Sequence, residues 1–375
     1  MEVTDVEPIN LDPEMEEAAM ALGDNEQQVS VRPVVVRVHT DAGITGLGET
    51  LAYTDLEADV IVDGVELLSR HLVGSDPREI TRRWQELYTD AKRSQAYKPM
   101  SALDQALWDI AGKDAGKPLY ELLGGQTGPL YAYATFPFRR STEELIDNGQ
   151  WLAEKGFDSM KITVGTDVEA DKERIDAVAS ALPDGFGLSI DANTSFSFSE
   201  ALEVAAAGET HDLVWFEEPI AHTDIDGQAE LNRRTSVPIA AYQTHTPHYP
   251  AVDHLEANAL EVYQPALYLC GGVTGGKRVA TLTEAYDKRF VPHAYGPLVN
   301  YAASVHLAAA SPASDLIEFA IYDDDLDDPG RYISSPYVEN QDAIYVDDEG
   351  VITPPEEPGL GIRLDADAVE AYRVD

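Results

Sequence analysis

Basic side chains are scarce in this sequence of 375 residues, which has 26 Lys and Arg against 68 Asp and Glu and a formal net charge of −42. A phosphate backbone or an anionic lipid surface would repel such a chain, so we expect neither nucleic acid nor a membrane as a partner. The apolar content of 44% opposes the disorder that high charge can cause. The composition therefore predicts a folded protein with a solvating acidic surface, of the kind that suits a high-salt cytoplasm.

Cysteine and long apolar runs are also lacking. Cys270 is the single cysteine, which excludes a disulfide within the chain and fits a reducing compartment. The N-terminal "MEVTDVEPINLDPEMEEAAM" has neither the basic start nor the apolar run of a signal peptide. No apolar stretch approaches the length that spans a bilayer. We therefore expect a soluble, cytoplasmic protein.

The first zone, residues 1–126, mixes strand and helix signals. The stretch "VRPVVVRVHTDAGITGLGET" predicts two strands around the turn "DAG". Helical periodicity follows, up to "SALDQALWDIAGKDAGKPLYELLGG", where Gly124 and Gly125 are expected to stop the last helix.

From residue 129 to about 320, short apolar runs alternate with helical patterns such as "STEELIDNGQWLAEKG", in which Ser141 and Glu144 have capping-box spacing. The runs are 130–136, 159–164, 187–192, 213–218, 237–242, 259–265, 289–294 and 315–320. Eight strands alternating with helices predict an α/β fold built on a parallel TIM (β/α) barrel. A doubly wound open sheet is the alternative, but no Gly-rich phosphate loop follows the first strand. We assign 127–325 to the barrel, and we expect a tail of 326–375 to pack back on the first zone.

Polar side chains follow the predicted strands where an active site would lie in such a barrel. They are Lys161, Thr163, Asp191, Asn193, Glu217, Glu218, Gln243, His293 and Glu318. Asp191, Glu217 and Gln243 are each 26 residues apart, so they occupy equivalent places on successive strands. Two carboxylates and an amide oxygen are hard ligands that suit Mg²⁺. The spacing favours a magnesium site over three solvated loop residues.

The sequence resembles the mandelate racemase / muconate lactonizing enzyme branch of the enolase superfamily, with an acidic composition like that of haloarchaeal proteins. The resemblance covers nearly the whole chain, through "GLGET", "ALWDIAGKDAGKPLYELLGG", "MKITVG", "IDAN", "WFEEP", "CGGVT", "PHAYGPLVNYAASVHLAAA" and "PGLGIRLD". It implies an α+β capping domain on a modified barrel, a homo-oligomer, and a small carboxylate substrate. It also implies that a base removes the proton α to that carboxylate while Mg²⁺ stabilises the enediolate. The step that follows differs among members: reprotonation, loss of a β-hydroxide, or ring closure or opening.

Three positions depart from the family pattern. Strand 2 usually reads Lys-x-Lys, and here Lys161 matches the first lysine while Thr163, a poor base, replaces the second. Lys161 is either an electrostatic partner of the substrate or a replacement base, and we favour the first. Gln243 stands where the third metal ligand is usually Glu, and His245 either assists it or is a plain loop residue.

The third departure is Ala266, at the place of the aspartate that usually orients the strand 7 histidine. His293 matches that histidine and would be less basic without a carboxylate beside it. Glu318 matches the strand 8 carboxylate that acts on the substrate carboxylate in racemases. These positions favour chemistry with one base, His293, over a two-base racemase.

Three hypotheses remain. The first is a Mg²⁺-dependent lyase that dehydrates a sugar acid of the aldonate or aldarate type to a 2-keto-3-deoxy acid. The second is a racemase, epimerase or cycloisomerase of the same superfamily. The third is a non-catalytic paralogue that retains the fold.

Substrate contacts are expected from the barrel and from the capping domain, in the region before "VSVRP" and in the loop of residues 45–55. We assign Thr163 and Asn193 on the barrel to substrate binding. In the stretch "YTDAKRSQAYKPM", Lys92, Arg93 and Lys98 are unusual cations in so acidic a chain and would meet an anionic substrate. Salt bridges with neighbouring acids are the alternative role for these three residues.

Overall fold

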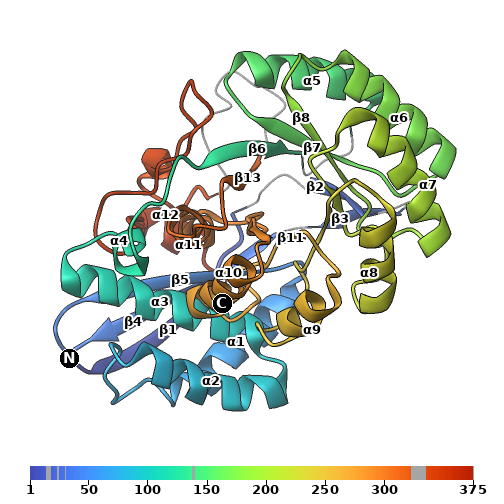
Figure 1. Cartoon of the computed structure of the whole chain (residues 1–375). Coiled ribbons are helices and arrows are strands. Elements are labelled where there is room, and N and C mark those ends of the chain that lie inside the picture. Colours follow the sequence, from blue (N-terminus) through green and yellow to red (C-terminus); the bar gives the residue numbers. More distant parts are fainter. Residues whose placement is uncertain (14–17, 23–24, 30, 137–139, 322–334, 375) are drawn as a thin grey trace.

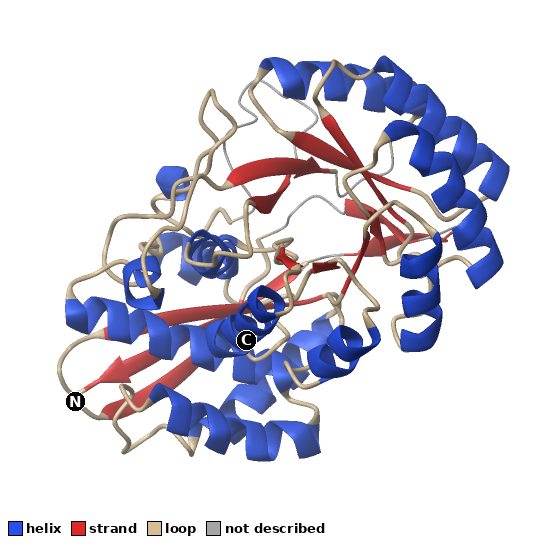
Figure 2. Ribbon diagram, viewed as in Figure 1, coloured by secondary structure: helices blue, strands red, loops and turns tan. Residues whose placement is uncertain are grey.

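Two main sheets organise the protein, one in the first zone of the chain and one in the barrel zone (Figures 1 and 2). This computed structural model describes residues 1–375 apart from 14–17, 23–24, 30, 137–139, 322–334 and 375. The expected boundary between barrel and tail at 325/326 lies outside the described residues. Along the part that is described, no helix combines the length and the apolarity needed to cross a bilayer.

The first sheet is antiparallel, with strands in the order β1-β4-β5. Its strands are β1 (Val3–Asn10), β4 (Arg32–Thr40) and β5 (Thr45–Ala52), and a separate hairpin is formed by β2 (Ala18–Leu22) and β3 (Asn25–Val29). The helices of this zone are α1 (Asp55–Ser69), α2 (Ile80–Ser94), α3 (Tyr97–Ala115) and α4 (Leu119–Leu123). The predicted hairpin of β4 and β5 is confirmed, and α4 ends at Gly124, whose φ of 134° suits glycine. We call this α+β unit the capping domain.

The second sheet contains eight parallel strands in the order β12-β11-β10-β9-β8-β7-β6-β13. They are β6 (Tyr131–Thr135), β7 (Ser159–Thr163), β8 (Gly187–Asp191), β9 (Phe216–Glu217), β10 (Ile239–Ala241), β11 (Val262–Tyr263), β12 (Arg289–Phe290) and β13 (Leu316–Ala320). Each lies inside one of the eight predicted apolar runs. The first strand, β6, pairs with the last, β13, so the sheet curls round into a barrel. The backbone N–H of Phe290 donates to Ala313 at 2.8 Å, which links β12 to the segment before β13.

Helices follow the barrel strands and cover the outside of the sheet (Figure 1). They are α5 (Thr142–Glu154), α6 (Val168–Ala181), α7 (Phe198–Gly208), α8 (Ile225–Arg234), α9 (Pro250–Ala257), α10 (Gly272–Ala285) and α11 (Leu298–Ala309). The 3₁₀ turns η1 (Glu209–His211) and η2 (Gln341–Ala343) and the last helix α12 (Ala366–Tyr372) complete the described elements. The predicted capping box is present: Ser141 Oγ accepts from Glu144 N at 3.2 Å, and the Glu144 carboxylate accepts from Ser141 N at 2.6 Å.

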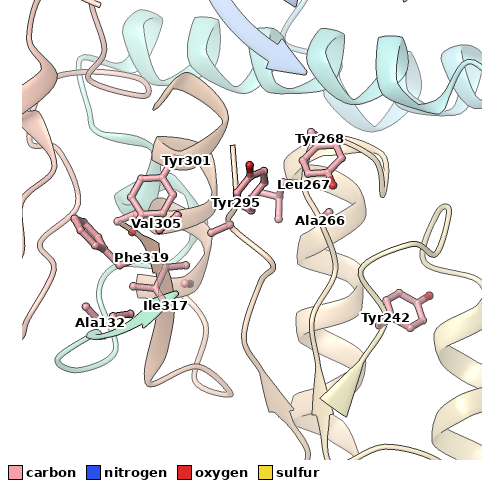
Figure 3. Close-up of a cluster of buried hydrophobic side chains, with 14 of the residues drawn as sticks. Ala132, Tyr242, Ala266, Leu267, Tyr268, Tyr295, Tyr301, Val305, Ile317 and Phe319 are labelled. Carbon is pink, nitrogen blue, oxygen red and sulfur yellow. The ribbon is translucent and has the colours of Figure 1, made fainter. Parts of the chain in front are cut away.

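Buried apolar side chains fix the strands that carry the site (Figure 3). Ile317 and Phe319 on β13 are both fully buried, and the Phe319 ring lies 6.3 Å from that of Tyr301 on α11. Glu318 lies between them in the strand, so its side chain faces the other way, into the barrel. The Tyr301 hydroxyl donates to the Glu318 backbone carbonyl at 2.8 Å, which holds that residue in place.

Two buried acids of the capping domain bind the N-termini of barrel helices. Glu49 accepts from the backbone N–H groups of Val299 and Asn300 at 2.8 and 3.0 Å, in the first turn of α11. Asp104 on α3 accepts from Thr274 N at 2.8 Å, in the first turn of α10. A helix N-terminus carries partial positive charge and unpaired N–H groups, so a carboxylate there is stabilising. These contacts fix the capping domain against the barrel.

The tail contacts both units. Val374 N donates to Asn10 O at 3.0 Å, and Leu119 N donates to Gly359 O at 2.8 Å, so the tail lies against the capping domain. Ile352 N donates to Leu130 O at 2.8 Å, beside the first barrel strand. The tail therefore joins the capping domain to the barrel rather than extending one of them.

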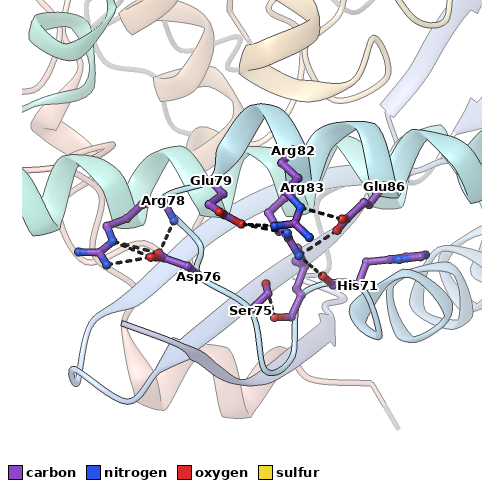
Figure 4. A network of polar contacts seen from close by, with 9 residues as sticks. His71, Ser75, Asp76, Arg78, Glu79, Arg82, Arg83 and Glu86 are labelled. Atoms are coloured by element: carbon purple, nitrogen blue, oxygen red, sulfur yellow. Dashed lines mark hydrogen bonds and ion pairs between the residues drawn. The ribbon is translucent and has the colours of Figure 1, made fainter.

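Arginines of α2 and of the loop before it are engaged in ion pairs at the surface (Figure 4). Arg83, which is buried, lies 3.1 Å from Glu79 and 2.8 Å from Glu86, and it donates to the His71 carbonyl at 3.2 Å. Arg78 forms a second pair with Asp76 at 2.8 Å. These arginines therefore form ion pairs with acids of the capping domain itself.

Candidate active site

A cavity of about 340 Å³ opens at the C-terminal ends of the barrel strands, below the capping domain. Its lining comes from both units: Tyr53, Glu57, Lys98, Thr135, Phe136, Lys161, Thr163, Asp191, Asn193, Gln243, Thr244, Tyr268, Leu269, His293, Tyr295 and Glu318. The strand register explains why the barrel residues meet, because Thr163 pairs with Asp191 and Asp191 with Glu217 across three neighbouring strands. Gln243 does not follow this register, because Glu217 pairs with Ala240 and Gln243 lies three residues further on, beyond the end of β10. The prediction of equivalent places is therefore wrong for Gln243, although its side chain still lines the cavity.

Lys161 lies at the centre of three carboxylates. Its Nζ is 2.8 Å from Glu217 Oε1, 3.2 Å from Asp191 Oδ2 and 3.6 Å from Glu318 Oε1. Burial disfavours the charged ammonium, but these carboxylates outweigh burial and hold the pKa of Lys161 well above its ordinary value. A lysine held in its charged form attracts the anionic end of a substrate and is a poor proton acceptor.

Glu217 is fully buried and has several partners besides Lys161. Its Oε2 accepts from Gln264 Nε2 at 2.7 Å and from Trp215 Nε1 at 3.2 Å. Burial raises the pKa of Glu217, and the pull of Lys161 in the other direction does not cancel the rise. The positive charge near Glu217 is therefore too small to offset the cost of burying its ionised carboxylate.

Glu218 is a second buried carboxylate. The sequence analysis placed it at a strand end but assigned it no role. It adopts a φ of 40° and accepts from Gln243 Nε2 at 2.7 Å through Oε2. Its Oε1 is buried and has no hydrogen-bond partner among the described residues. Burial, with the nearby charges of Asp191 and Glu217, raises the pKa of Glu218 to about 8. A buried acid left in this state is a candidate for binding a cation.

His293 is paired with a carboxylate despite the alanine at the expected partner position. Ala266 pairs with His293 in an isolated parallel bridge and brings no polar group, as the sequence predicts. Glu318 supplies the acid instead, with Oε2 3.0 Å from His293 Nδ1, close enough for an ion pair although not aligned as a hydrogen bond. Burial lowers the pKa of His293, but Glu318 outweighs burial and the net shift is upward. The expectation that His293 has no carboxylate on its other nitrogen is therefore wrong.

Thr163 and Asn193 both line the cavity, as predicted for substrate-binding residues. Thr163 lies at the end of β7, at the place of the missing second lysine. Asn193 adopts a φ of 45°, and its backbone N–H donates to Asp191 Oδ1 at 2.9 Å, so it orients that carboxylate. Neither side chain is a base, whereas His293, which can be neutral, lines the same cavity as Lys161.

The three capping-domain cations have different fates. Lys98 lines the cavity, and its Nζ lies 2.6 Å from Glu57 Oε1. Lys92 and Arg93 do not line it: Lys92 lies over the Tyr88 ring, and Arg93 is largely exposed, 3.8 Å from Asp90. The helix α2 explains why Lys92 and Arg93 miss the cavity. Its buried face contains Trp84, Leu87 and Ala91, and the two cations that follow Ala91 lie off that face. The alternative role of pairing with nearby acids fits Arg93, and it holds for Lys98 as well, which both lines the cavity and pairs with Glu57.

His245 lies outside the cavity, in a group of aromatic rings. It stacks on Tyr242 with ring centroids 4.5 Å apart and lies 4.8 Å from His254. Burial lowers the pKa of His245 to about 3, so the ring is neutral near pH 7. The possibility that it assists Gln243 receives no support from these contacts.

The charges at the barrel rim fit a divalent cation. Four buried carboxylates (Asp191, Glu217, Glu218 and Glu318) lie around one lysine and one histidine. If all four were ionised, their negative charge would exceed the positive charge of these two groups. Among the residues with described side chains, no three His, Cys, Asp or Glu groups already form a metal cluster, and Lys161 occupies the space between Asp191 and Glu217. The donors are nevertheless the hard oxygens that Mg²⁺ prefers, and one of them, Glu218 Oε1, is unpaired.

Tyr53, Glu57, Tyr268 and Tyr295 are cavity residues that the sequence patterns did not single out. Residues 45–52 of the expected 45–55 loop form the strand β5 instead. Tyr53 follows that strand within the expected range, and Glu57 lies two residues beyond the range, in the first turn of α1. Tyr268 and Tyr295 follow strand ends by a few residues. The sequence search stopped within two residues of each strand end and did not consider tyrosines, so it missed them.

These two units define the class of the protein: a β/α-barrel enzyme whose site is closed by a separate α+β domain. Comparison with known families agrees. Residues 7–124 match the mandelate racemase / muconate lactonizing enzyme N-terminal domain, and residues 144–368 match the enolase C-terminal domain-like family. The chain belongs to the mandelate racemase / muconate lactonizing enzyme branch of the enolase superfamily.

Individual relatives are similar along almost their whole length. The chain is 33% identical to the D-galactarolactone cycloisomerase of Agrobacterium fabrum, covering 91% of each chain. It is 29% identical to the arabinonate dehydratase of Saccharolobus solfataricus, covering 91% of this chain and 90% of the relative. Among solved structures, a Streptomyces coelicolor racemase with bound magnesium superposes with a TM-score of 0.86 at 25% identity, over 99% of this chain and all of the other.

Proposed function

We propose that this enzyme removes the proton α to the carboxylate of a sugar acid and then eliminates the β-hydroxyl group to form a 2-keto-3-deoxy acid. The observation that carries the proposal is the pairing of His293 with Glu318 beside Lys161, in a cavity whose other predicted base position holds Thr163. A site with one base supports proton removal from a single side of the substrate, as an elimination requires. Relatives named as sugar-acid dehydratases support the same class.

His293 is the proposed general base. Glu318 occupies the neighbourhood of Nδ1, which leaves Nε2 as the nitrogen that a substrate in the cavity can reach. Nε2 would accept the α-proton, and Glu318 would stabilise the imidazolium that forms. The same nitrogen can then return the proton to the departing β-hydroxyl oxygen, so that water leaves and the ring is neutral again.

Lys161 is proposed to stabilise the charge that develops on the substrate carboxylate. Its ammonium is kept protonated by its three acidic neighbours, so it supplies fixed positive charge in a buried site. Asp191, Glu217 and Gln243 are proposed to hold Mg²⁺, with Glu218 close by. When bound, the ion would polarise the carboxylate and lower the energy of the enediolate.

The test is a panel of aldonates, aldonolactones and aldarates, assayed with Mg²⁺ for 2-keto acid formation and for exchange of the α-proton in D₂O. We expect turnover of at least one acid, abolished in His293→Asn and retained in the control His211→Asn, which changes a histidine outside the cavity lining. Turnover that survives His293→Asn contradicts the proposed base. No turnover with Mg²⁺ demonstrably bound would count against the proposed reaction, and no exchange of any acid together with weak Mg²⁺ binding would support a non-catalytic paralogue.

A cycloisomerase is the second candidate, because the relative with 33% identity bears that name. It shares the proton transfer at the α-carbon but rearranges a lactone without net loss of water. Conversion of an aldonolactone to an isomer of equal mass, with no 2-keto-3-deoxy product from open-chain aldonates, would select it. Racemisation fits less well, since Thr163 offers no second base.

A further inference from the structure

The capping-domain wall of the cavity carries one ion pair, between Lys98 on α3 and Glu57 on α1. Lys98 Nζ donates to Glu57 Oε1 at 2.6 Å and to the Leu51 carbonyl at 3.0 Å. The ammonium also lies over the Tyr53 ring, 5.0 Å from its centroid. The side chain of Lys98 is 15% exposed, so these contacts hold it in a nearly closed environment.

The local backbone places Glu57 for this role. Thr54 caps α1 and its Oγ1 accepts from Glu57 N at 3.1 Å, which fixes Glu57 in the first helical turn. The Glu57 carboxylate then reaches back, and its Oε2 accepts from Tyr53 N at 2.8 Å. Both carboxylate oxygens therefore have a partner, and one of the partners is the Lys98 ammonium.

The pair has no net charge but keeps hydrogen-bonding capacity toward the cavity. An ammonium has three donors, and two are used by Glu57 and Leu51; the carboxylate oxygens can each accept again. A hydroxyl group both donates and accepts, so adjacent hydroxyls of a sugar chain match this wall. A carboxylate matches it poorly, because it would lie close to the like charge of Glu57.

The other cations that line the described cavity are already engaged with acids. Lys161 contacts three carboxylates, and His293 is paired with Glu318. We assign these groups, with the Mg²⁺ that the site would bind, to the reacting end of the substrate. Around the described lining, no second uncompensated cation remains for a second substrate carboxylate.

We propose that the Glu57–Lys98 pair makes this site selective for monocarboxylate sugar acids, in which a neutral polyhydroxyl tail meets the pair, and that Glu57 excludes aldarates. The inference rests on the proposed function, since it assumes that the reacting carboxylate binds at the barrel rim. It narrows the substrate class to aldonates or aldonolactones.

The experiment measures dissociation constants for D-galactonate and galactarate, which differ at the terminal carbon, by calorimetry at one fixed Mg²⁺ and KCl concentration. We expect the native enzyme to prefer galactonate by about tenfold. Glu57→Gln keeps the shape and the acceptor but frees the Lys98 charge, so it should shift the preference toward galactarate by about tenfold. Lys98→Gln should shift it the other way, because Glu57 then stands unpaired.

The control Glu66→Gln removes the same charge from an exposed position on the same helix and should leave the preference unchanged. A purely structural role for the pair would weaken both acids together, so an unchanged ratio in both pair variants overturns the inference. Native preference for galactarate also overturns it.

The two proposals can fail separately. If the ratio shifts as expected but neither acid exchanges its α-proton, the substrate preference stands and the proposed reaction fails. If both acids react and Glu57→Gln leaves the ratio of their dissociation constants unchanged, the proposed reaction stands and the inference fails. If neither acid binds to any variant, both are overturned.

Discussion

His293 Nδ1 lies 3.0 Å from Glu318 Oε2, so the histidine of one barrel strand is served by the carboxylate of the next strand round the barrel. The pair takes the place of a partner on the strand before, where Ala266 stands. Glu318 also lies 3.6 Å from Lys161, so the same carboxylate contacts both the histidine and the lysine of the site. The pairing would let His293, the proposed base, keep its basicity.

The first prediction concerns the pH dependence of proton removal. A base works when it is neutral, so the rate rises as pH rises through the pKa of His293. Glu318 holds that pKa up, and Glu318→Gln removes the charge, so the rising limb of the exchange rate should move to lower pH. The rate at the plateau should fall as well, since the imidazolium loses its stabilising neighbour.

The measurement is the pH profile of α-proton exchange in D₂O for the native enzyme and for Glu318→Gln. If the rising part of the profile stays at the same pH in Glu318→Gln, even with a lower plateau rate, then Glu318 does not raise the pKa of His293. Glu339→Gln, an exposed acid of the tail, serves as the control.

The second prediction concerns the stability of the metal-free site. Lys161→Met leaves Asp191, Glu217 and Glu318 buried without their ammonium. Breaking such a buried network is expected to cost on the order of 3 to 5 kcal/mol of unfolding free energy. Added Mg²⁺ should restore more stability to the variant than to the native protein, because the ion relieves the same repulsion.

Thermal denaturation with EDTA and with Mg²⁺ tests this. Lys117→Met is a matched control, since Lys117 pairs with Glu121 at an exposed position. Equal stabilisation of Lys161→Met and native protein by Mg²⁺ would argue against an ion binding site among these carboxylates.

The third prediction concerns Gln243, which lines the cavity and donates to Glu218. Gln243→Glu adds a charged oxygen ligand and should tighten Mg²⁺ binding by about tenfold. Calorimetric titration with Mg²⁺ measures the change, and Gln126→Glu repeats the substitution at an exposed loop. Unaltered affinity in Gln243→Glu would place the ion away from this side chain.

The fourth prediction concerns acid stability and His306, which lies fully buried on α11. Its Nδ1 accepts from Tyr120 N at 3.3 Å and its Nε2 lies 3.2 Å from the Leu360 carbonyl. Burial lowers the pKa of His306 to about 4. The unfolded chain binds this proton near pH 6.5, so the contribution of His306 is complete above that pH and is lost as pH falls toward 4.

This contribution amounts to on the order of 3 kcal/mol. His306→Gln removes the titrating ring and keeps a donor for Leu360, so the variant should lose less stability than the native protein between about pH 7.5 and about pH 4.5. Urea denaturation at both values measures the difference. Equal losses in the two proteins would assign the acid sensitivity to other groups.

Strand order and the barrel rim could be predicted from sequence because both depend on local patterns. Each apolar run contains one strand, and the 26-residue spacing carries Asp191 and Glu217 to paired positions on adjacent strands. The link between His293 and Glu318 could not be predicted in this way. It depends on how far the His293 and Glu318 side chains reach between β12 and β13. The spacing of residues along the chain does not specify that distance.

The capping-domain contribution was harder to predict for a similar reason. Lys92, Arg93 and Lys98 look alike in sequence, but they sit on two helices with different buried faces, and of these three only Lys98 reaches the cavity. Glu57 gave no signal as a site residue, because its position in the first turn of α1 resembles an ordinary helix start. Its role appears when Lys98, 41 residues later, folds against it.

The edge of the first sheet has a consequence for association between copies of the chain. β1 is an edge strand, and such strands can pair with a neighbouring molecule. Val73 bridges to Val3 at one end of β1, and Arg373 bridges to Leu11 just beyond the other. The C-terminal residues therefore pair with one end of this edge, at Asn10–Asp12, and shortening the C-terminus would leave that end unpaired even though every residue of the cavity lining remained in place.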